Sequence, residues 1–182
     1  MNPSIPYGGP PSGRPAATGP AGPRGEPVAD WPLRALARVI DLVVFLGVWW
    51  GLVLFAAVVI AMLLPPEVMN APEVPPAYDA LVWVWFFCGP LLQWLGDWLC
   101  HAQWGATLGK RMLSLRVVAV SDGGLPTGGQ AAGRAALAWL PGLLPCLGTL
   151  FQLVDAASPL WDERRRAWHD VAAGTLVVRT RW

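Results

Sequence analysis

The sequence predicts an all-α membrane protein, a small bundle of transmembrane helices with a short cytoplasmic β-pair. Hydrophobic residues make up 54% of the 182 residues, charged residues make up 14%, and the mean hydropathy is +0.43. These values are too apolar for a water-soluble domain. Two long apolar runs follow one another, and basic residues flank the pair while the loop between them is acidic. A net charge of +1 gives no general attraction to nucleic acid, which we exclude as a partner.

Residues 1–30 are rich in proline, glycine, alanine and serine. Such a composition buries too little apolar surface to offset the entropy of an ordered chain, so we expect a disordered cytoplasmic tail. This stretch lacks the apolar core of a secretion signal. The first helix is therefore expected to act as its own insertion signal.

The first helix is predicted over residues 33–64 and the second over residues 80–99. Each can cross a bilayer, which takes about 20 apolar residues. Pro65 and Pro66 end the first helix, because proline lacks a backbone donor and disfavours helix in the residue before it. Trp49 and Trp50 fall near mid-membrane, where we expect them to pack between helices or against lipid.

The distribution of charge predicts the orientation of this helix pair. The acidic loop holds no lysine or arginine, whereas Arg34 and Arg38 precede the first span and further basic residues follow the second. Positive charge remains inside, so the N-terminus should be cytoplasmic. Anionic lipid headgroups are the expected contacts of the basic residues after the second span, each contributing about 1 kcal/mol. These residues are Lys110, Arg111 and Arg116.

A third apolar segment, residues 131–160, is broken by Pro141, Gly142 and Pro145. As a single span it would place the arginines after it outside, against the positive-inside bias. A re-entrant or interfacial helical hairpin would return them to the cytoplasm, and we favour that alternative. The β-prone stretches at 110–120 and 175–178 could then pair as two short strands.

Asp41 places a charge within an apolar helix, and burying that charge costs free energy unless a polar group pairs with it. Arg34 and Arg38 lie on the same face of this helix and are one set of possible partners. A polar stripe in the second helix, formed by Gln93, Asp97 and His101, is the other. The candidates for an ion or proton site are Asp41, Gln93 and Asp97; the alternative is that they only fix helix packing.

Three blocks of sequence together resemble the RDD family of bacterial membrane proteins, over about residues 31–180. The resemblance implies that Arg34, Asp41 and Asp170 are the arginine and two aspartates of the family name. It also implies membrane topology similar to that described above, with ligand or cation transport proposed for the family. The positions that carry the resemblance are Arg34, Ala37 and Asp41; Gly105, Thr107, Gly109, Lys110, Arg111, Val117 and Val118; and His169, Asp170, Ala173, Gly174, Thr175, Val177 and Val178.

Two classes of function remain open at this level. One is transport of ions or small ligands, such as cation or proton exchange with Asp41 carrying the exchangeable charge. Because two or three spans cannot enclose a pathway, this requires a homo-oligomer or a larger membrane complex. The other is an accessory or scaffold protein that binds partners or anionic lipids through its tail and basic inner face. No acid, base and nucleophile converge, so we expect no enzyme, no cofactor and no metal.

Overall fold

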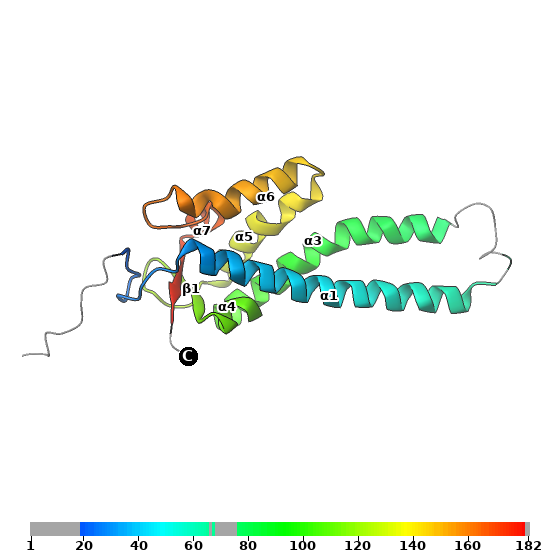
Figure 1. Cartoon of the computed structure of the whole chain (residues 1–182), viewed down its shortest axis with the longest axis horizontal. Coiled ribbons are helices and arrows are strands. Elements are labelled where there is room, and N and C mark those ends of the chain that lie inside the picture. The colour runs from blue at the N-terminus through cyan, green and yellow to red at the C-terminus, as the bar shows by residue number, and fades with distance from the viewer. Residues whose placement is uncertain (1–18, 66, 68–75, 181–182) are drawn as a thin grey trace, which may run out of the picture.

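The computed structural model describes residues 19–65, 67 and 76–180. The tail up to residue 18 and most of the predicted acidic loop therefore lie outside the described residues. Two long helices run side by side along the molecule, and the shorter elements gather at one end of them (Figure 1). The elements are α1 (Trp31–Leu63), α3 (Pro76–Trp104), α4 (Leu108–Met112), β1 (Leu115–Ala119), α5 (Gly128–Trp139), η1 (Leu140–Leu143), α6 (Leu147–Ala157), η2 (Ser158–Leu160), α7 (Trp168–Ala172) and β2 (Thr175–Arg179).

We call the end with the short elements the base (residues 19–41, 97–139 and 155–180) and the long apolar helices beyond it the shaft (residues 42–63 and 80–96). Among the described residues, α1 is the helix that is long and apolar enough to cross a membrane. Its buried residues are Arg34, Ala37 and Trp49, and most of its apolar side chains are exposed. The core helix of a soluble protein would bury such side chains, whereas lipid accepts them.

Contact between the two helices of the shaft is aromatic. The ring centroid of Trp85 lies 5.0 Å from that of Trp49 and 4.5 Å from that of Trp50. Trp49 is buried, while Trp50 remains 59% exposed. Both tryptophans therefore pack against the other long helix, which is one of the two predicted alternatives; packing of the exposed part of Trp50 against lipid stays a prediction.

The third apolar segment forms a helical hairpin, not one continuous helix. Helix α5 has 12 residues and α6 has 11, and the turn η1 joins them. The start of α6 packs closely against this turn, because a Cβ on Gly148 would lie 1.6 Å from the carbonyl oxygen of Pro141. The hairpin lies alongside the long helices and is shorter than both (Figure 1). At 1.5 Å per residue, neither arm alone is long enough to cross a bilayer.

The predicted pairing of two short strands is confirmed. Strands β1 and β2 are antiparallel, and Leu115 pairs with Arg179 at one end of the ladder and Ala119 with Thr175 at the other. Leu115 and Val177 are fully buried in a small core that also contains Ala37 of α1. The sheet therefore joins the C-terminal part of the chain to the start of the first long helix.

The segment before α1 is part of the fold. The N–H of Ala29 donates to the carbonyl of Val177 at 2.9 Å, and the N–H of Arg179 donates to the carbonyl of Pro27, also at 2.9 Å. Val28 and Ala29 are buried. The predicted boundary of the disordered tail at residue 30 is therefore wrong, because these residues extend the two-stranded sheet and fill its core.

Candidate functional site

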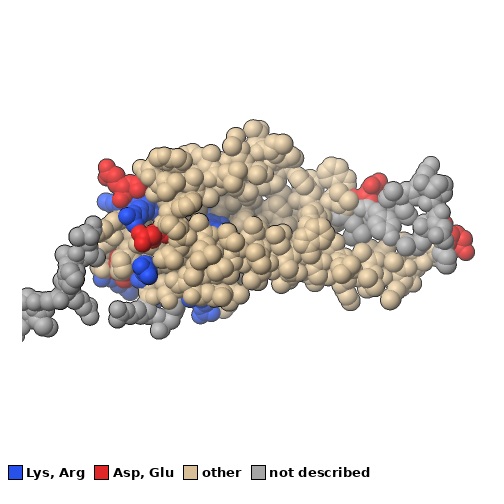
Figure 2. Space-filling model, in the orientation of Figure 1, with Lys and Arg blue, Asp and Glu red and all other residues tan. Residues whose placement is uncertain are grey.

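Charged side chains are buried in the base, where α1, α3, α4, α5 and α7 meet. Arginine, lysine, aspartate and histidine are seldom buried unless they pair with one another. On the face shown in Figure 2, lysine and arginine side chains gather toward the base together with acidic ones, whereas the opposite end carries acidic side chains. The polar cluster consists of Arg34, Asp97, His101, Lys110, Arg134, Asp155, His169 and Asp170.

Asp170 lies at the centre of this cluster between two arginines. Arg34 forms an ion pair with its Oδ2, and Arg134 donates from Nε to its Oδ1 at 2.8 Å. The backbone N–H of Ala167 also donates to Oδ2, at 3.2 Å. Burial acts to raise the pKa of Asp170, but Arg34 and Arg134 outweigh it and hold that pKa well below its usual value. Asp170 is therefore a carboxylate that ties α1 to α5 and α7.

His169 is held as a neutral imidazole. Its Nδ1 lies 2.5 Å from Oδ2 of Asp155, so Nδ1 carries the hydrogen and donates. Its Nε2 then accepts from Arg38 at 3.3 Å and from Arg134 at 3.4 Å. Burial lowers the pKa of His169, against the opposing effects of Asp170 and Asp155. A proton on Nε2 would add a positive charge beside two guanidinium groups.

His101 on α3 has the same arrangement. Its Nδ1 lies 2.6 Å from the backbone carbonyl of Asp97, which can only accept, so Nδ1 carries the hydrogen. Its Nε2 accepts from Nη1 of Arg134 at 2.9 Å and from Nζ of Lys110 at 3.0 Å. The two histidines thus join two aspartates, two arginines and a lysine without carrying charge themselves.

Asp41 has partners that differ from both sets considered above. Its Oδ2 accepts from the hydroxyl of Thr107 at 2.5 Å, and its Oδ1 accepts from the backbone N–H of Gly109 at 2.7 Å. Asp41 therefore accepts hydrogen bonds from otherwise unpaired donors at the start of α4, since the first N–H groups of a helix have no partner within it. Neither Arg34 nor the Gln93 and Asp97 turn supplies its hydrogen bonds.

Lys110 is buried, with 4% of its surface exposed, and its ammonium faces His101. The expectation that it contacts lipid headgroups is wrong, because α4 turns this side chain into the base. Arg111, the next residue, is exposed and stacks over the ring of Trp104 at 5.7 Å. Arg116 is half-buried on β1.

The positions that carry the family resemblance fall into adjoining parts of the base. Gly109 sits where α4 approaches α1, since a Cβ there would lie 2.3 Å from the carbonyl oxygen of Ala37. Gly105 and Gly174 have positive φ, at +69° and +63°, and each precedes a chain reversal. Thr175 is buried on β2 with its hydroxyl 3.4 Å from Oδ1 of Asp170. Gln93 is half-buried on α3 and takes no part in the hydrogen bonds described above.

Sequence reasoning missed Arg134 and Asp155, which contribute to the polar cluster from the two arms of the hairpin. Both were read as part of an apolar segment. A signal was present, because a lone arginine and a lone aspartate in such a segment are costly and need partners. Arg134 is 1% exposed and holds Asp170, His101 and His169 together.

The fold and the cluster define a class: helical proteins with a long, exposed apolar shaft and buried ion pairs at one end of it. The model of the RDD family matches residues 28–174, and the chain belongs to the RDD family. The chain is accordingly a membrane protein, and the resemblance seen in its sequence is confirmed. Among curated proteins and solved structures, none matches it.

Of the residues behind the family name, Arg34 and Asp170 form an ion pair, whereas Asp41 holds the start of α4. The Arg34–Asp170 ion pair therefore connects α1 with α7, and the hydrogen bonds of Asp41 connect α1 with α4.

Proposed function

We propose that the chain is a multi-pass protein of the plasma (inner) membrane that exchanges monovalent cations for protons. In this proposal α1 and α3 both cross the bilayer, the base lies in the cytoplasm, and the protein is not an enzyme. The basic residues of the base, with the acidic Glu67 and Asp79 at the other end of the shaft, support this orientation.

One observation carries the proposal: the carboxylate of Asp97 is buried with an oxygen that has no partner. Asp97 is 7% exposed, and its Oδ2 has no hydrogen bond from any of the described residues. A buried anionic oxygen without a donor is costly, so such a group is retained where a cation or a proton visits it. Because both oxygens of Asp41 are occupied, Asp97 replaces Asp41 as the residue expected to carry the exchangeable charge.

Exchange requires several copies of the chain. Two long helices and a short hairpin do not surround a pathway across the bilayer, so a second copy has to supply the remaining wall. Gly47 and Gly51 lie one helical turn apart on α1, and, apart from the surrounding backbone of this helix, no heavy atom of the described residues lies within 4 Å of a Cβ placed on either. Small residues at this spacing let helices approach closely in membranes. We therefore infer a homo-oligomer.

The test is cation-driven proton flux in proteoliposomes that contain the purified full-length protein. An outward sodium gradient should acidify the lumen, because each sodium ion that leaves brings a proton in. The lumen pH is followed with a pH-sensitive dye, and Asp97→Asn should abolish the change. Asp162→Asn is the matched control, because Asp162 pairs with Arg166 at the surface of the base. Equal flux in the Asp97→Asn variant and in the wild type would show that the carboxylate does not carry the exchange.

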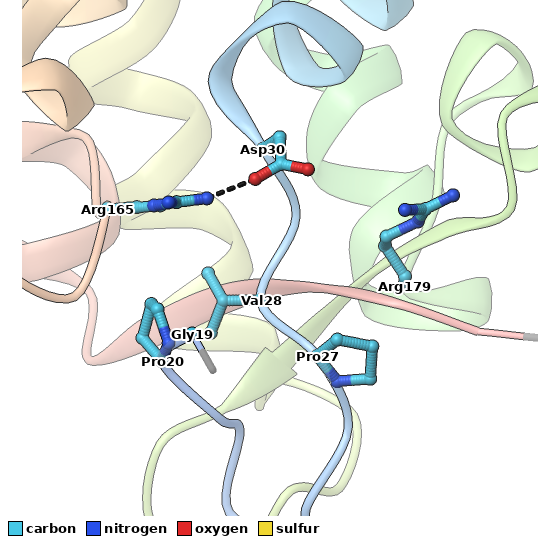
Figure 3. A pocket seen from close by; sticks show the side chains of 7 residues that line it. All are labelled: Gly19, Pro20, Pro27, Val28, Asp30, Arg165 and Arg179. Carbon is cyan, nitrogen blue, oxygen red and sulfur yellow. Dashed lines mark hydrogen bonds and ion pairs between the residues drawn. The ribbon is translucent and has the colours of Figure 1, made fainter. Parts of the chain in front are cut away.

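The accessory function is a second candidate, favoured by a pocket in the base of about 240 Å³. It opens between the segment before α1 and the end of β2, where Arg165 reaches Asp30 on one side and Arg179 lies on the other (Figure 3). Two arginines beside a pocket suit a phosphate group of an anionic lipid. Arg179→Gln should then weaken recovery of the protein on anionic vesicles relative to neutral ones. A tail deletion should stop at residue 18, since residues 27–30 belong to the fold.

A further inference from the structure

The buried carboxylate of Asp97 is only partly satisfied. Its Oδ1 lies 3.3 Å from Nδ1 of His101, but that nitrogen donates at 2.6 Å to the backbone carbonyl of Asp97 itself. Its Oδ2 is buried and without a partner among the described residues. The carboxylate therefore has an acceptor free for a cation or a donor.

Lys110 is the neighbouring group with donors to spare. Its ammonium has three N–H bonds, and the acceptor it has in the structure is Nε2 of His101 at 3.0 Å. His101 thus lies between Lys110 and Asp97, since its Nε2 faces the lysine and its Nδ1 faces the backbone carbonyl of Asp97. The charges of Lys110 and Asp97 therefore interact electrostatically.

Groups from each neighbouring element set the charge around Lys110. Asp97 and His101 face it from α3, Arg134 from α5, and Arg38 and Asp41 from α1, while Arg111 follows it on α4. Burial lowers the pKa of Lys110 to about 7; Asp97 acts to raise it, and Arg134 and Arg38 act to lower it further. Near neutral pH the lysine therefore loses its proton at little cost.

We propose that Lys110 is the group that releases a proton when a monovalent cation binds to Asp97. In this step an N–H bond of the ammonium breaks, the proton leaves to water, and the cation takes a place against Oδ2 with water completing its coordination. One positive charge enters as one leaves, so the net charge of the polar cluster is unchanged. The proposal rests on the exchange function above and adds the residue that carries the proton.

The physical reason is electrostatic competition. If the cation bound while Lys110 stayed protonated, a further positive charge would be buried near Arg134 and Arg38, and such charges are strongly unfavourable without a counterion. If Lys110 were neutral with no cation bound, the negative charge of Asp97 would lose one of the positive charges that stabilise it. The two occupants therefore exclude each other, which is the requirement for exchange instead of simple leak.

The experiment measures proton release by the full-length protein in detergent micelles. Sodium chloride or potassium chloride is added to weakly buffered protein at pH 7 with a pH indicator, and choline chloride serves as the control salt. Because the pKa of Lys110 is about 7, about half of the chains still carry the proton at this pH, and we expect release of about half a proton per chain. Below about pH 7 the affinity for the cation should rise about tenfold per pH unit, and above it the affinity should become level.

Three variants isolate Lys110. Lys110→Arg keeps the positive charge but does not titrate, so it should release no proton. Lys110→Met should bind the cation without pH dependence, and a symmetric elution profile confirms that each variant is folded. Arg111→Gln, on the same short helix but exposed, should behave as the wild type. Proton release from Lys110→Arg equal to that of the wild type would overturn the proposal, as would no release from the wild type.

Flux in proteoliposomes and proton release in micelles test the exchange function and the role of Lys110 separately. Flux in proteoliposomes that persists in Lys110→Arg would overturn the role of Lys110 and leave exchange standing. Cation-linked proton release in micelles without flux in proteoliposomes would leave the role of Lys110 standing and overturn exchange.

Discussion

The base and the shaft of this protein are held by different interactions. In the base, Asp170 connects two arginines, a two-stranded sheet closes a small core, and the charged residues of the polar cluster are buried. In the shaft, apolar side chains are exposed along both helices, which touch through Trp85 against Trp49 and Trp50. The base is thus specified by contacts within the chain, whereas the shaft depends on lipid or on another copy for the burial of its surface.

The difference matters for function because the buried charges lie where the two regions meet. A polar network is costly to bury, and it fixes geometry only when its members are satisfied. Asp170, His169 and Arg134 are satisfied and hold the ends of the helices in the base in place. Asp97 is not fully satisfied, so it is the place in the network where a ligand can act on the helices.

The largest expected effect is that of Asp170→Asn. Removing this charge leaves Arg34 and Arg134 buried without their counterion, which typically costs about 3–5 kcal/mol. Thermal unfolding in detergent should show this loss in the free energy of unfolding. The matched control is Asp162→Asn, whose partner Arg166 lies near the surface and whose ion pair contributes about 0–1 kcal/mol. Equal losses in the two variants would contradict the central place given to Asp170.

Gly109→Ala should have the next largest effect. The new methyl group would lie 2.3 Å from the carbonyl oxygen of Ala37, which is backbone and moves only with α1 or α4. Overpacking of this kind costs about 1–3 kcal/mol. In the shaft, Gly96 of α3 is exposed, so Gly96→Ala places its methyl group in open space and should be neutral or stabilising by about 0.5–1 kcal/mol. A stable Gly109→Ala variant would show that α4 does not pack tightly on α1.

Sequence patterns predicted the shaft well and the base in part. Uninterrupted apolar runs and terminating prolines are local signals, so α1 begins and ends within two residues of its predicted bounds. The hairpin and the strand pair were also foreseen, because Pro141, Gly142 and Pro145 break the third segment. Charge bias alone predicted a lipid contact for Lys110, since nothing local shows that α4 turns this residue inward.

The site required tertiary information that local patterns do not contain. Arg134 and Asp170 are separated by 36 positions and meet because α5 and α7 pack together. The partners of Asp41 lie 66 and 68 positions further along the chain, at the start of α4. The sequence indicated that Asp41 needed a polar partner, but helical periodicity favoured residues on the long helices and not a hydroxyl and a backbone amide at the start of a short helix.

The smallest expected effect on the fold comes from Gly47→Leu and Gly51→Leu in the shaft. Neither glycine has a neighbour within 4 Å of a built Cβ, so a larger side chain is accommodated within a single chain and the free energy of unfolding should barely change. The oligomer should respond instead, because leucine holds two helix backbones apart. Light scattering in mild detergent should show a lower mass for both variants, while Val48→Leu, on an adjacent exposed position, should keep the mass of the wild type. If the mass falls and proton flux falls with it, the shaft acts through a second copy; if the mass is unchanged, the copies meet elsewhere or lipid alone covers this face.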